Sequence, residues 1–183
     1  MNKKITTFLA FAKNIFITGA VTETSRKAEV AICKFIPKDE HKIIVEFGMG
    51  HGNITKEILN NISSTSKVYS FEIKKSFCDY VKNEISDSRL IIINDSADSI
   101  KKHIKEDVDA VIGSIPFSFF SKEKGIEIIQ NAYDKLVNKA YYSQVLYTKF
   151  NYKKFQQIFE KCSMQCIKHI PTEYIYHCRK ELN

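Results

Sequence analysis

The chain has 183 residues, of which 44% are hydrophobic and 27% charged, and its formal net charge is +7. This length suits one globular domain, and the balance of apolar and charged residues excludes a disordered or fibrous chain. No uninterrupted apolar run reaches about 18 residues, which excludes a conventional transmembrane helix, and five scattered cysteines favour reduced thiols over a disulfide framework.

The positive charge is concentrated at the two ends. Residues 1–42 hold eight Lys/Arg against four Asp/Glu, and residues 149–183 hold seven against three, whereas residues 43–148 hold thirteen against fourteen. Such a distribution suits an anionic partner, either a phosphate backbone or an acidic membrane surface, although solubility alone explains the charge equally well.

The first predicted elements in chain order are helices. Apolar residues recur at helical spacing over residues 3–16, and a second helix is predicted over residues 24–35, before Pro37. We treat residues 1–42 as the helical start of a single domain that spans 1–183. The apolar stripe of residues 3–16 either lies in a membrane interface or packs on the domain. The expected location is therefore cytoplasmic, with peripheral attachment to the inner membrane face in the first case.

From residue 43 onward, short apolar runs alternate with helical periodicity. This alternation predicts right-handed βαβ units and a mostly parallel sheet, and the last two strands are close enough in sequence that they must be antiparallel. The expected fold class is α/β, a Rossmann-like seven-stranded sheet that ends in an antiparallel hairpin. The predicted strands are 43–47, 68–72, 90–93, 108–112, 140–147, 164–170 and 174–178, and the predicted helices are 54–62, 75–85, 96–104, 124–136 and 152–159.

A glycine-rich turn follows the first predicted strand. Gly48, Gly50 and Gly52 let the backbone pass close to a ligand, and the helix that begins near Asn53 presents free N–H groups and the positive end of its dipole. The spacing G-x-G-x-G differs from the NAD fingerprint, which places a third glycine at Asn53. Alone, the loop is also compatible with a tight turn that needs positive φ and binds no ligand.

Acidic residues stand at the ends of the next two predicted strands. Glu72 ends the second strand, where a carboxylate can accept hydrogen bonds from both hydroxyls of a ribose. Asp95-Ser96-Ala97 closes the third strand, where a carboxylate or a backbone amide can contact the edge of an adenine. Each acid alone is more typical of a surface or capping residue, but their joint placement at successive strand ends predicts a nucleotide-like ligand.

The fourth predicted strand runs into Ser114-Ile115-Pro116-Phe117. Pro116 has no N–H, and we expect the carbonyls around it to be free to face a substrate amine. Phe117, together with the phenylalanines at 119 and 120, either walls an apolar pocket or packs in the core.

These residues together resemble class I S-adenosylmethionine (SAM)-dependent methyltransferases. Within that class they look most similar to the bacterial phospholipid and ornithine-lipid N-methyltransferases, which are related to the ribosomal RNA adenine dimethylases. Residues 11–26 resemble the opening segment of the family, and residues 170–179 resemble the closing hairpin of the lipid enzymes. The resemblance implies SAM as the cofactor and no metal. The cofactor residues that it implies are Glu46, Gly48, Gly50 and Gly52 at the methionine end, Glu72 at the ribose, and Asp95 with Ser96 at the adenine. Ile73, Ala97 and Ser114 are further expected cofactor-binding residues.

One departure concerns the substrate. The adenine dimethylases carry Asn-(Leu/Ile)-Pro-(Tyr/Phe) where this chain has Ser114-Ile115-Pro116-Phe117. The amide of Asn can accept a hydrogen bond from the planar amine of adenine, whereas the shorter Ser hydroxyl reaches it less well. The lipid enzymes tolerate a small residue here, and the chain has only a short tail after its hairpin. Both features favour a lipid headgroup amine, of the phosphatidylethanolamine or ornithine-lipid type.

The predicted reaction is in-line displacement at the sulfonium methyl by an amine nitrogen. The predicted catalytic residues are Tyr147, Ser114 and Pro116, and the predicted substrate-binding residues are Phe117, Tyr147 and His51. Tyr147 or His51 is the candidate to assist removal of the amine proton. Gln144 and Tyr147 fall where the lipid enzymes carry a polar-aromatic motif, which is only partly matched. Two alternatives stay open: an RNA adenine N6-methyltransferase, with RNA as its partner, and a SAM-fold binding module without catalysis.

Overall fold

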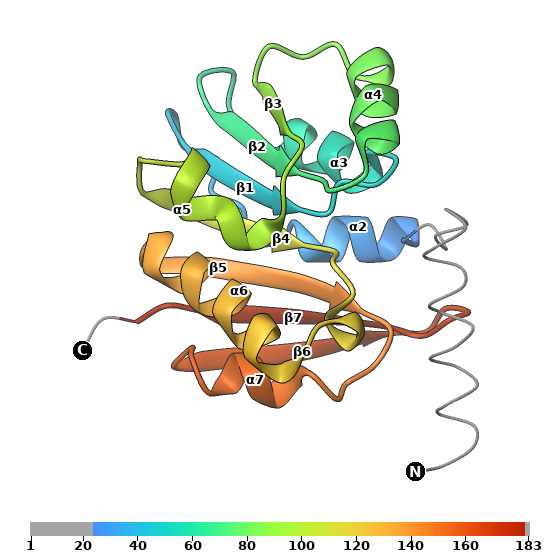
Figure 1. The fold of residues 1–183 in the computed structure, drawn as a ribbon, viewed down its shortest axis with the longest axis vertical. Coiled ribbons are helices and arrows are strands. Elements are labelled where there is room, and N and C mark those ends of the chain that lie inside the picture. Colours follow the sequence, from blue (N-terminus) through green and yellow to red (C-terminus); the bar gives the residue numbers. More distant parts are fainter. Residues whose placement is uncertain (1–23, 182–183) are drawn as a thin grey trace.

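The computed structural model describes residues 24–181, which form one seven-stranded sheet covered by helices (Figure 1). The strand order is β3-β2-β1-β4-β5-β7-β6. Strands β1 to β5 are mutually parallel, whereas β7 is antiparallel to both β5 and β6. The predicted α/β class and the closing hairpin are thereby confirmed. The strands are β1 (Ile43–Phe47), β2 (Lys67–Phe71), β3 (Leu90–Ile93), β4 (Val108–Gly113), β5 (Leu136–Leu146), β6 (Lys161–Ile167) and β7 (Glu173–Arg179).

Helices cover both faces of the sheet. One apolar cluster joins α2 and α3 to one face, and a second joins α5, α6 and α7 to the other, because neighbouring residues of each buried strand point to opposite sides. The bounds are α2 (Arg26–Ile32), α3 (Asn53–Asn61), α4 (Lys75–Glu84), α5 (Ile100–His103), α6 (Lys122–Lys135) and α7 (Tyr152–Gln156). The helix expected over residues 3–16 lies outside the described residues.

Two predicted boundaries differ from the structure for local reasons. The segment 96–104 is a 3₁₀ turn followed by the short α5, because the carbonyl of Ser96 accepts hydrogen bonds from both the backbone N–H and the hydroxyl of Ser99. Strand β5 begins directly after α6, four residues earlier than expected. Its start is irregular: Lys139 has a φ of 66°, and the register with β4 shifts between Val108 and Ala110.

The start of α2 is fixed to the start of β7. Ser25 caps α2 by accepting a hydrogen bond from the N–H of Ala28. The backbone N–H and the hydroxyl of Ser25 both donate to the buried carboxylate of Glu173. The chain that leads into α2 is therefore held at the end of the sheet where the parallel strands terminate.

The register brings all the strand ends of interest to one edge. Phe47 is paired with Phe71 of β2 and with Gly113 of β4, and Gly113 is paired with Gln144 of β5. In Figure 1 the arrowheads of these strands and the connection between β6 and β7 lie on the same side of the molecule. Ligands of open α/β sheets bind at this carboxyl edge, so we expect a ligand-binding site here.

Gly113 is required by a close side-chain approach. A Cβ at this position would lie 2.1 Å from Gln144 Oε1 and 3.1 Å from a ring carbon of Tyr142, and both neighbours are buried. We expect Gly113→Ala to lower the free energy of unfolding by about 1–3 kcal/mol, because the added methyl overpacks the core. Urea unfolding measures this change. If the clash with Gln144 is the cause, the double variant with Gln144→Ala will lose less stability than the two single losses together; simple additivity would contradict this account.

Candidate cofactor site

The three glycines of the loop after β1 all have positive φ, namely 81° at Gly48, 50° at Gly50 and 83° at Gly52. A Cβ at Gly48 would lie 2.9 Å from the side chain of Ile115, and one at Gly52 would lie 3.0 Å from Ile85. At Gly50 no atom lies within 4 Å of the Cβ position, so the space above this peptide is open. The loop is therefore a turn that only glycine suits, with room for a ligand at its middle.

Glu72 joins the glycine loop to the end of β2. Its side chain is largely buried, with Oε2 accepting a hydrogen bond of 3.2 Å from Gly50 N–H and Oε1 one of 2.9 Å from Lys74 N–H. Asn94 fixes this segment from β3, because its side-chain amide donates to the carbonyls of Glu72 and Ile73. Sequence reasoning missed Asn94, although its position at the end of a predicted strand beside Asp95 was a usable signal.

Asp95 is held by His103 and Lys102 from the next helix. Its Oδ2 accepts hydrogen bonds from His103 Nε2 at 2.7 Å and from Lys102 Nζ at 3.1 Å, and its Oδ1 accepts one from Ser96 N–H at 2.8 Å. The bond from His103, followed by those from Ser96 and Lys102, lowers the pKa of Asp95 well below its usual range. Asp95 is thus a fixed carboxylate at the rim of the site. The hydrogen bond between Asp95 and His103 could not be predicted from the sequence pattern.

These elements enclose a cavity of about 160 Å³ at the carboxyl edge of the sheet. Most of the predicted cofactor residues line it, and so does Pro116. The lining residues that were predicted are Gly48, Gly50, Glu72, Ile73, Asp95, Ser96, Ala97, Ser114 and Pro116, and the remaining ones are Phe71, Phe77, Ile115, Phe119 and Phe120.

Several predicted site residues lie elsewhere. Gly52 caps the start of α3, and the ring of His51 packs edge-on against Phe77 at 4.8 Å and Tyr80 at 5.3 Å. Phe117 is fully buried and packs against the ring of Phe155, so it belongs to the core and not to the cavity wall.

Tyr147 directly follows β5 at the same edge of the sheet, but it is not among the residues that line the cavity. The structure therefore brings neither of the two candidate proton acceptors, Tyr147 and His51, into the cavity itself. The titratable side chains that line it are Glu72 and Asp95, and both are occupied by protein hydrogen bonds.

Glu46, two residues before Gly48, joins β1 to α3 and β2 and does not line the cavity. It is buried, and its Oε2 accepts hydrogen bonds from Thr55 at 2.7 Å and from Ser70 at 2.6 Å. Its Oε1 has no hydrogen-bond partner in the described part of the chain. Burial raises the pKa of the Glu46 carboxyl to about 7; the two hydroxyl donors oppose this shift, and the negative charge of Glu72 adds to it.

Ser114 ties the end of β4 to the glycine loop. Its N–H donates to the carbonyl of Phe47 at 2.8 Å, and its hydroxyl donates to the carbonyl of Gly48. The hydroxyl proton of Ser114 is therefore engaged within the protein, and its oxygen can act toward the cavity only as an acceptor.

The carbonyls around Pro116 are hydrogen-bonded, contrary to expectation. Gln144, which is fully buried, donates from Nε2 to the carbonyl of Ile115 at 3.1 Å and accepts from the Tyr142 hydroxyl at 3.1 Å. The carbonyl of Pro116 accepts the N–H of Phe119 at 3.0 Å. Each of these two carbonyl oxygens keeps a second lone pair, so a substrate N–H can still be accepted.

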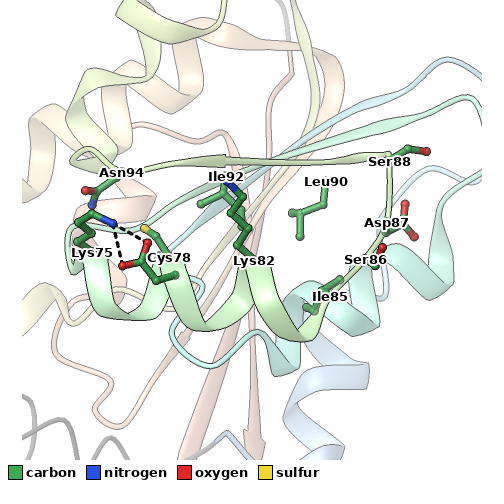
Figure 2. A pocket seen from close by; sticks show the side chains of 11 residues that line it. Lys75, Cys78, Lys82, Ile85, Ser86, Asp87, Ser88, Leu90, Ile92 and Asn94 are labelled. Carbon is green, nitrogen blue, oxygen red and sulfur yellow. Dashed lines mark hydrogen bonds and ion pairs between the residues drawn. The ribbon is translucent and has the colours of Figure 1, made fainter.

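A wider groove of about 650 Å³ lies between α4 and the edge strand β3 (Figure 2). Its lining contains none of the predicted site residues. Lys75 and Asp79, which both line it, form an ion pair with each other. Apolar side chains such as Ile85, Leu90 and Ile92 also line it, as Figure 2 shows. Size alone does not identify the site, and we assign the cofactor to the smaller cavity because the fixed carboxylates and the glycine loop meet there.

Within residues 24–181, no helix has both the length and the apolar character needed to cross a bilayer. The same part of the chain contains no group of three or more His, Cys, Asp or Glu side chains arranged to hold a metal ion.

Comparison with known proteins identifies the fold. No protein-family profile matches the chain. A stretch of 48 residues is 44% identical to the ribosomal RNA small subunit methyltransferase A of Mycoplasmopsis synoviae, and this stretch is 26% of the present chain and 17% of that protein. The chain thus matches less than a fifth of its curated relative.

Solved structures match over a much larger part of the chain. A putative rRNA-methylase from Clostridium thermocellum superimposes with a TM-score of 0.67 at 18% identity, covering 89% of this chain and 99% of that one. A putative methyltransferase from Streptococcus mutans in complex with S-adenosylhomocysteine (SAH) has a TM-score of 0.67 at 16% identity, covering 86% and 99% of the two chains. The protein therefore has the Rossmann-like fold of class I SAM-dependent methyltransferases.

The buried Glu46 makes stability depend on pH. In the folded protein this carboxyl keeps its proton up to about pH 7, whereas the unfolded chain releases it near 4.5, so the group destabilises the fold as the pH rises through this window. We expect Glu46→Gln to be more stable than the wild type at pH 8 by up to roughly 3 kcal/mol, and to lose this advantage at pH 5. Urea unfolding at both pH values measures the effect. An exposed change, Asp79→Asn, serves as the control; an equal difference between Glu46→Gln and wild type at both pH values would refute the assignment.

Proposed function

We propose that the protein is a SAM-dependent N-methyltransferase that acts on the amine of a lipid headgroup. SAM supplies an electrophilic methyl group on its sulfonium. The fit to this cofactor rests on the open space above Gly50, on the inward-facing carboxylate of Glu72 and on the exposed side chain of Ile73 at the cavity. Each feature suits one part of a nucleoside with a charged amino-acid tail.

The proposed cofactor contacts follow from the donors and acceptors present. The carboxylate of Glu72 would accept the two ribose hydroxyls, and the side chain of Ile73 would cover one face of the adenine. Asp95 and the backbone of Ser96 and Ala97 would meet the adenine edge. Glu46 would act on the methionine end by fixing the end of β1, from which the glycine loop starts, because Thr55 and Ser70 both donate to its carboxylate.

At the acceptor side, the chain offers backbone carbonyls and apolar walls. The free lone pairs of the Ile115 and Pro116 carbonyls would accept N–H groups of the amine and orient its own lone pair toward the methyl. Phe119 and Phe120 would exclude water from this end. Since Glu72 and Asp95 would be engaged by the cofactor, the ammonium proton would leave to solvent before the amine enters, with Tyr147 or His51 as a relay outside the cavity.

The observation that carries the choice of substrate is the hydrogen bond from the Ser114 hydroxyl to the Gly48 carbonyl. It holds the hydroxyl of Ser114 against the glycine loop, and because residue 114 is serine, the cavity has no side-chain amide to meet the planar amine of an adenine. A lipid amine is not planar, and the backbone carbonyls can accept its N–H groups.

RNA adenine N6-methylation is the second candidate. The 48-residue match to an rRNA methyltransferase favours it, and so do the rings of Phe119 and Phe120, on which a base could stack.

Glu72 gives the most direct test of the cofactor site. We expect Glu72→Gln to weaken SAH binding by about tenfold to a hundredfold, because hydrogen bonds to a charged acceptor are replaced by bonds to a neutral one. Titration calorimetry with SAH measures the affinity. Asp79→Asn makes the same chemical change at an exposed position outside the cofactor cavity and should bind SAH as the wild type does. Equal affinities of Glu72→Gln and wild type would remove Glu72 from the site.

Transfer of labelled methyl from SAM separates the candidate functions. The protein is offered vesicles of phosphatidylethanolamine and, in parallel, undermodified ribosomal RNA; we expect label in the lipid alone. Label in RNA alone would establish the second candidate and overturn the argument from Ser114. Absence of label from both, with measurable SAH binding, would refute both N-methyltransferase activities and leave a binding module.

A further inference from the structure

The two most exposed large apolar side chains of the described residues are Ile170, at 92%, and Phe150, at 70%. Single exposed hydrophobic residues are common on protein surfaces and need no explanation by themselves. These two are notable for where they lie. Phe150 follows Leu146 by four residues, Ile170 precedes Tyr174 by four residues, and Leu146 and Tyr174 are paired across β5 and β7.

Both residues therefore lie in loops at the carboxyl edge of the sheet, which also bears the cofactor cavity, and their side chains are exposed there. Strand β5 is the neighbour of β4, so the segment after β5 adjoins the segment after β4 that carries Pro116, Phe119 and Phe120. Figure 1 shows the β6–β7 connection on the side of the sheet toward which the parallel strands point.

The two loops that carry Phe150 and Ile170 are both anchored to the domain, so the exposure of these side chains is a feature of the fold. The loop after β5 is held by the hydroxyl of Tyr176, which donates to the carbonyl of Thr148 at 2.8 Å, and by the buried Asn151. The β6–β7 connection is held on one side by buried Ile167 and on the other by Glu173, which accepts the hydrogen bonds of Ser25.

Lysines accompany both apolar tips. Lys149 immediately precedes Phe150 and Lys168 lies two residues before Ile170; both are exposed, and neither forms an ion pair with residues 24–181. Apolar side chains flanked by lysines suit a surface that is anionic outside and apolar beneath, as an acidic bilayer is. An RNA backbone would use the lysines, but it would gain nothing from an aliphatic side chain such as Ile170.

We propose that these four residues, Lys149, Phe150, Lys168 and Ile170, form a docking edge that seats the protein on an anionic bilayer with the cavity mouth facing the headgroups. This inference rests on the proposed lipid substrate and specifies how such a substrate reaches the site. Phe150 and Ile170 enter the interface, and the two lysines contact anionic headgroups beside them. The lipid amine then reaches the cavity while its acyl chains stay in the bilayer.

A tryptophan reporter tests the docking edge directly, because the chain contains no tryptophan. Ile170→Trp places a single indole at the tip of the β6–β7 connection, and Met164→Trp places one at an exposed position in the middle of β6. With vesicles of phosphatidylethanolamine and phosphatidylglycerol, the emission of Ile170→Trp should shift to the blue, and that of Met164→Trp should not. Equal responses of the two reporters would overturn the proposal, as would a response of Ile170→Trp to RNA but not to vesicles.

Vesicle sedimentation of the full-length protein then separates the contribution of the lysines to vesicle binding from that of the apolar side chains. We expect the double variant Phe150→Asp/Ile170→Asp to bind these vesicles at least about tenfold more weakly, and Lys149→Gln/Lys168→Gln to lose roughly fivefold per lysine. Met164→Asp should bind as the wild type does. All variants should retain SAH binding, which shows that they are folded.

Methyl transfer to a short-chain, water-soluble phosphatidylethanolamine tests the lipid acceptor independently of the docking edge. If this lipid is methylated but Phe150→Asp/Ile170→Asp still binds vesicles as the wild type does, the docking edge is wrong and the proposed function stands. If the reporter and the variants behave as expected but no lipid is methylated, the docking edge stands and the lipid acceptor is wrong.

Discussion

The candidate site depends on how closely the glycine loop passes the end of β4. Gly48 donates its N–H to the carbonyl of Phe71 in β2 and accepts the hydroxyl of Ser114 after β4, while the N–H of Ser114 returns to the carbonyl of Phe47 in β1. The ends of three parallel strands are joined by this short network. A Cβ at Gly48 would meet Ile115 at 2.9 Å, so the approach exists only because residue 48 is glycine. This close approach of the glycine loop to the end of β4 sets the walls of the cavity between Glu72 and Pro116.

Around this point, the protein uses its own polar side chains to hold the backbone in place. Gln144 positions the carbonyl of Ile115, Asn94 positions those of Glu72 and Ile73, and His103 keeps Asp95 in one orientation. These internal hydrogen bonds do not use up the acceptor capacity of the ligand-binding groups, because the carbonyls and carboxylates keep further lone pairs. They make the cavity rigid before a ligand arrives, which is the condition under which alignment of two reactants accelerates a transfer.

The order of elements and the place of the site could be predicted from the sequence because both depend on local patterns. Alternating apolar runs predict the parallel sheet, and the glycines with Glu72 and Asp95 mark successive strand ends. Contacts between residues far apart in the chain left no such pattern. The pairing of Gln144 with Ile115 and that of Ser114 with Gly48 are set by the strand order, and periodicity does not encode them. For the same reason Phe117 could be a wall or a core residue until its neighbour Phe155 was known.

The closing hairpin links the cavity to the proposed docking edge. Because β7 runs antiparallel to β5, it begins where the parallel strands end, and it brings the connection 168–172 to the carboxyl edge from a part of the chain remote from the glycine loop. Glu173, the first residue of β7, binds Ser25 and so fixes the start of α2 at the same edge. A parallel seventh strand would have placed its preceding connection at the opposite edge. Because β7 runs opposite to the other strands, the exposed Phe150 and Ile170 lie on the same side of the domain as the cavity. The proposed bilayer-anchored substrate requires this arrangement.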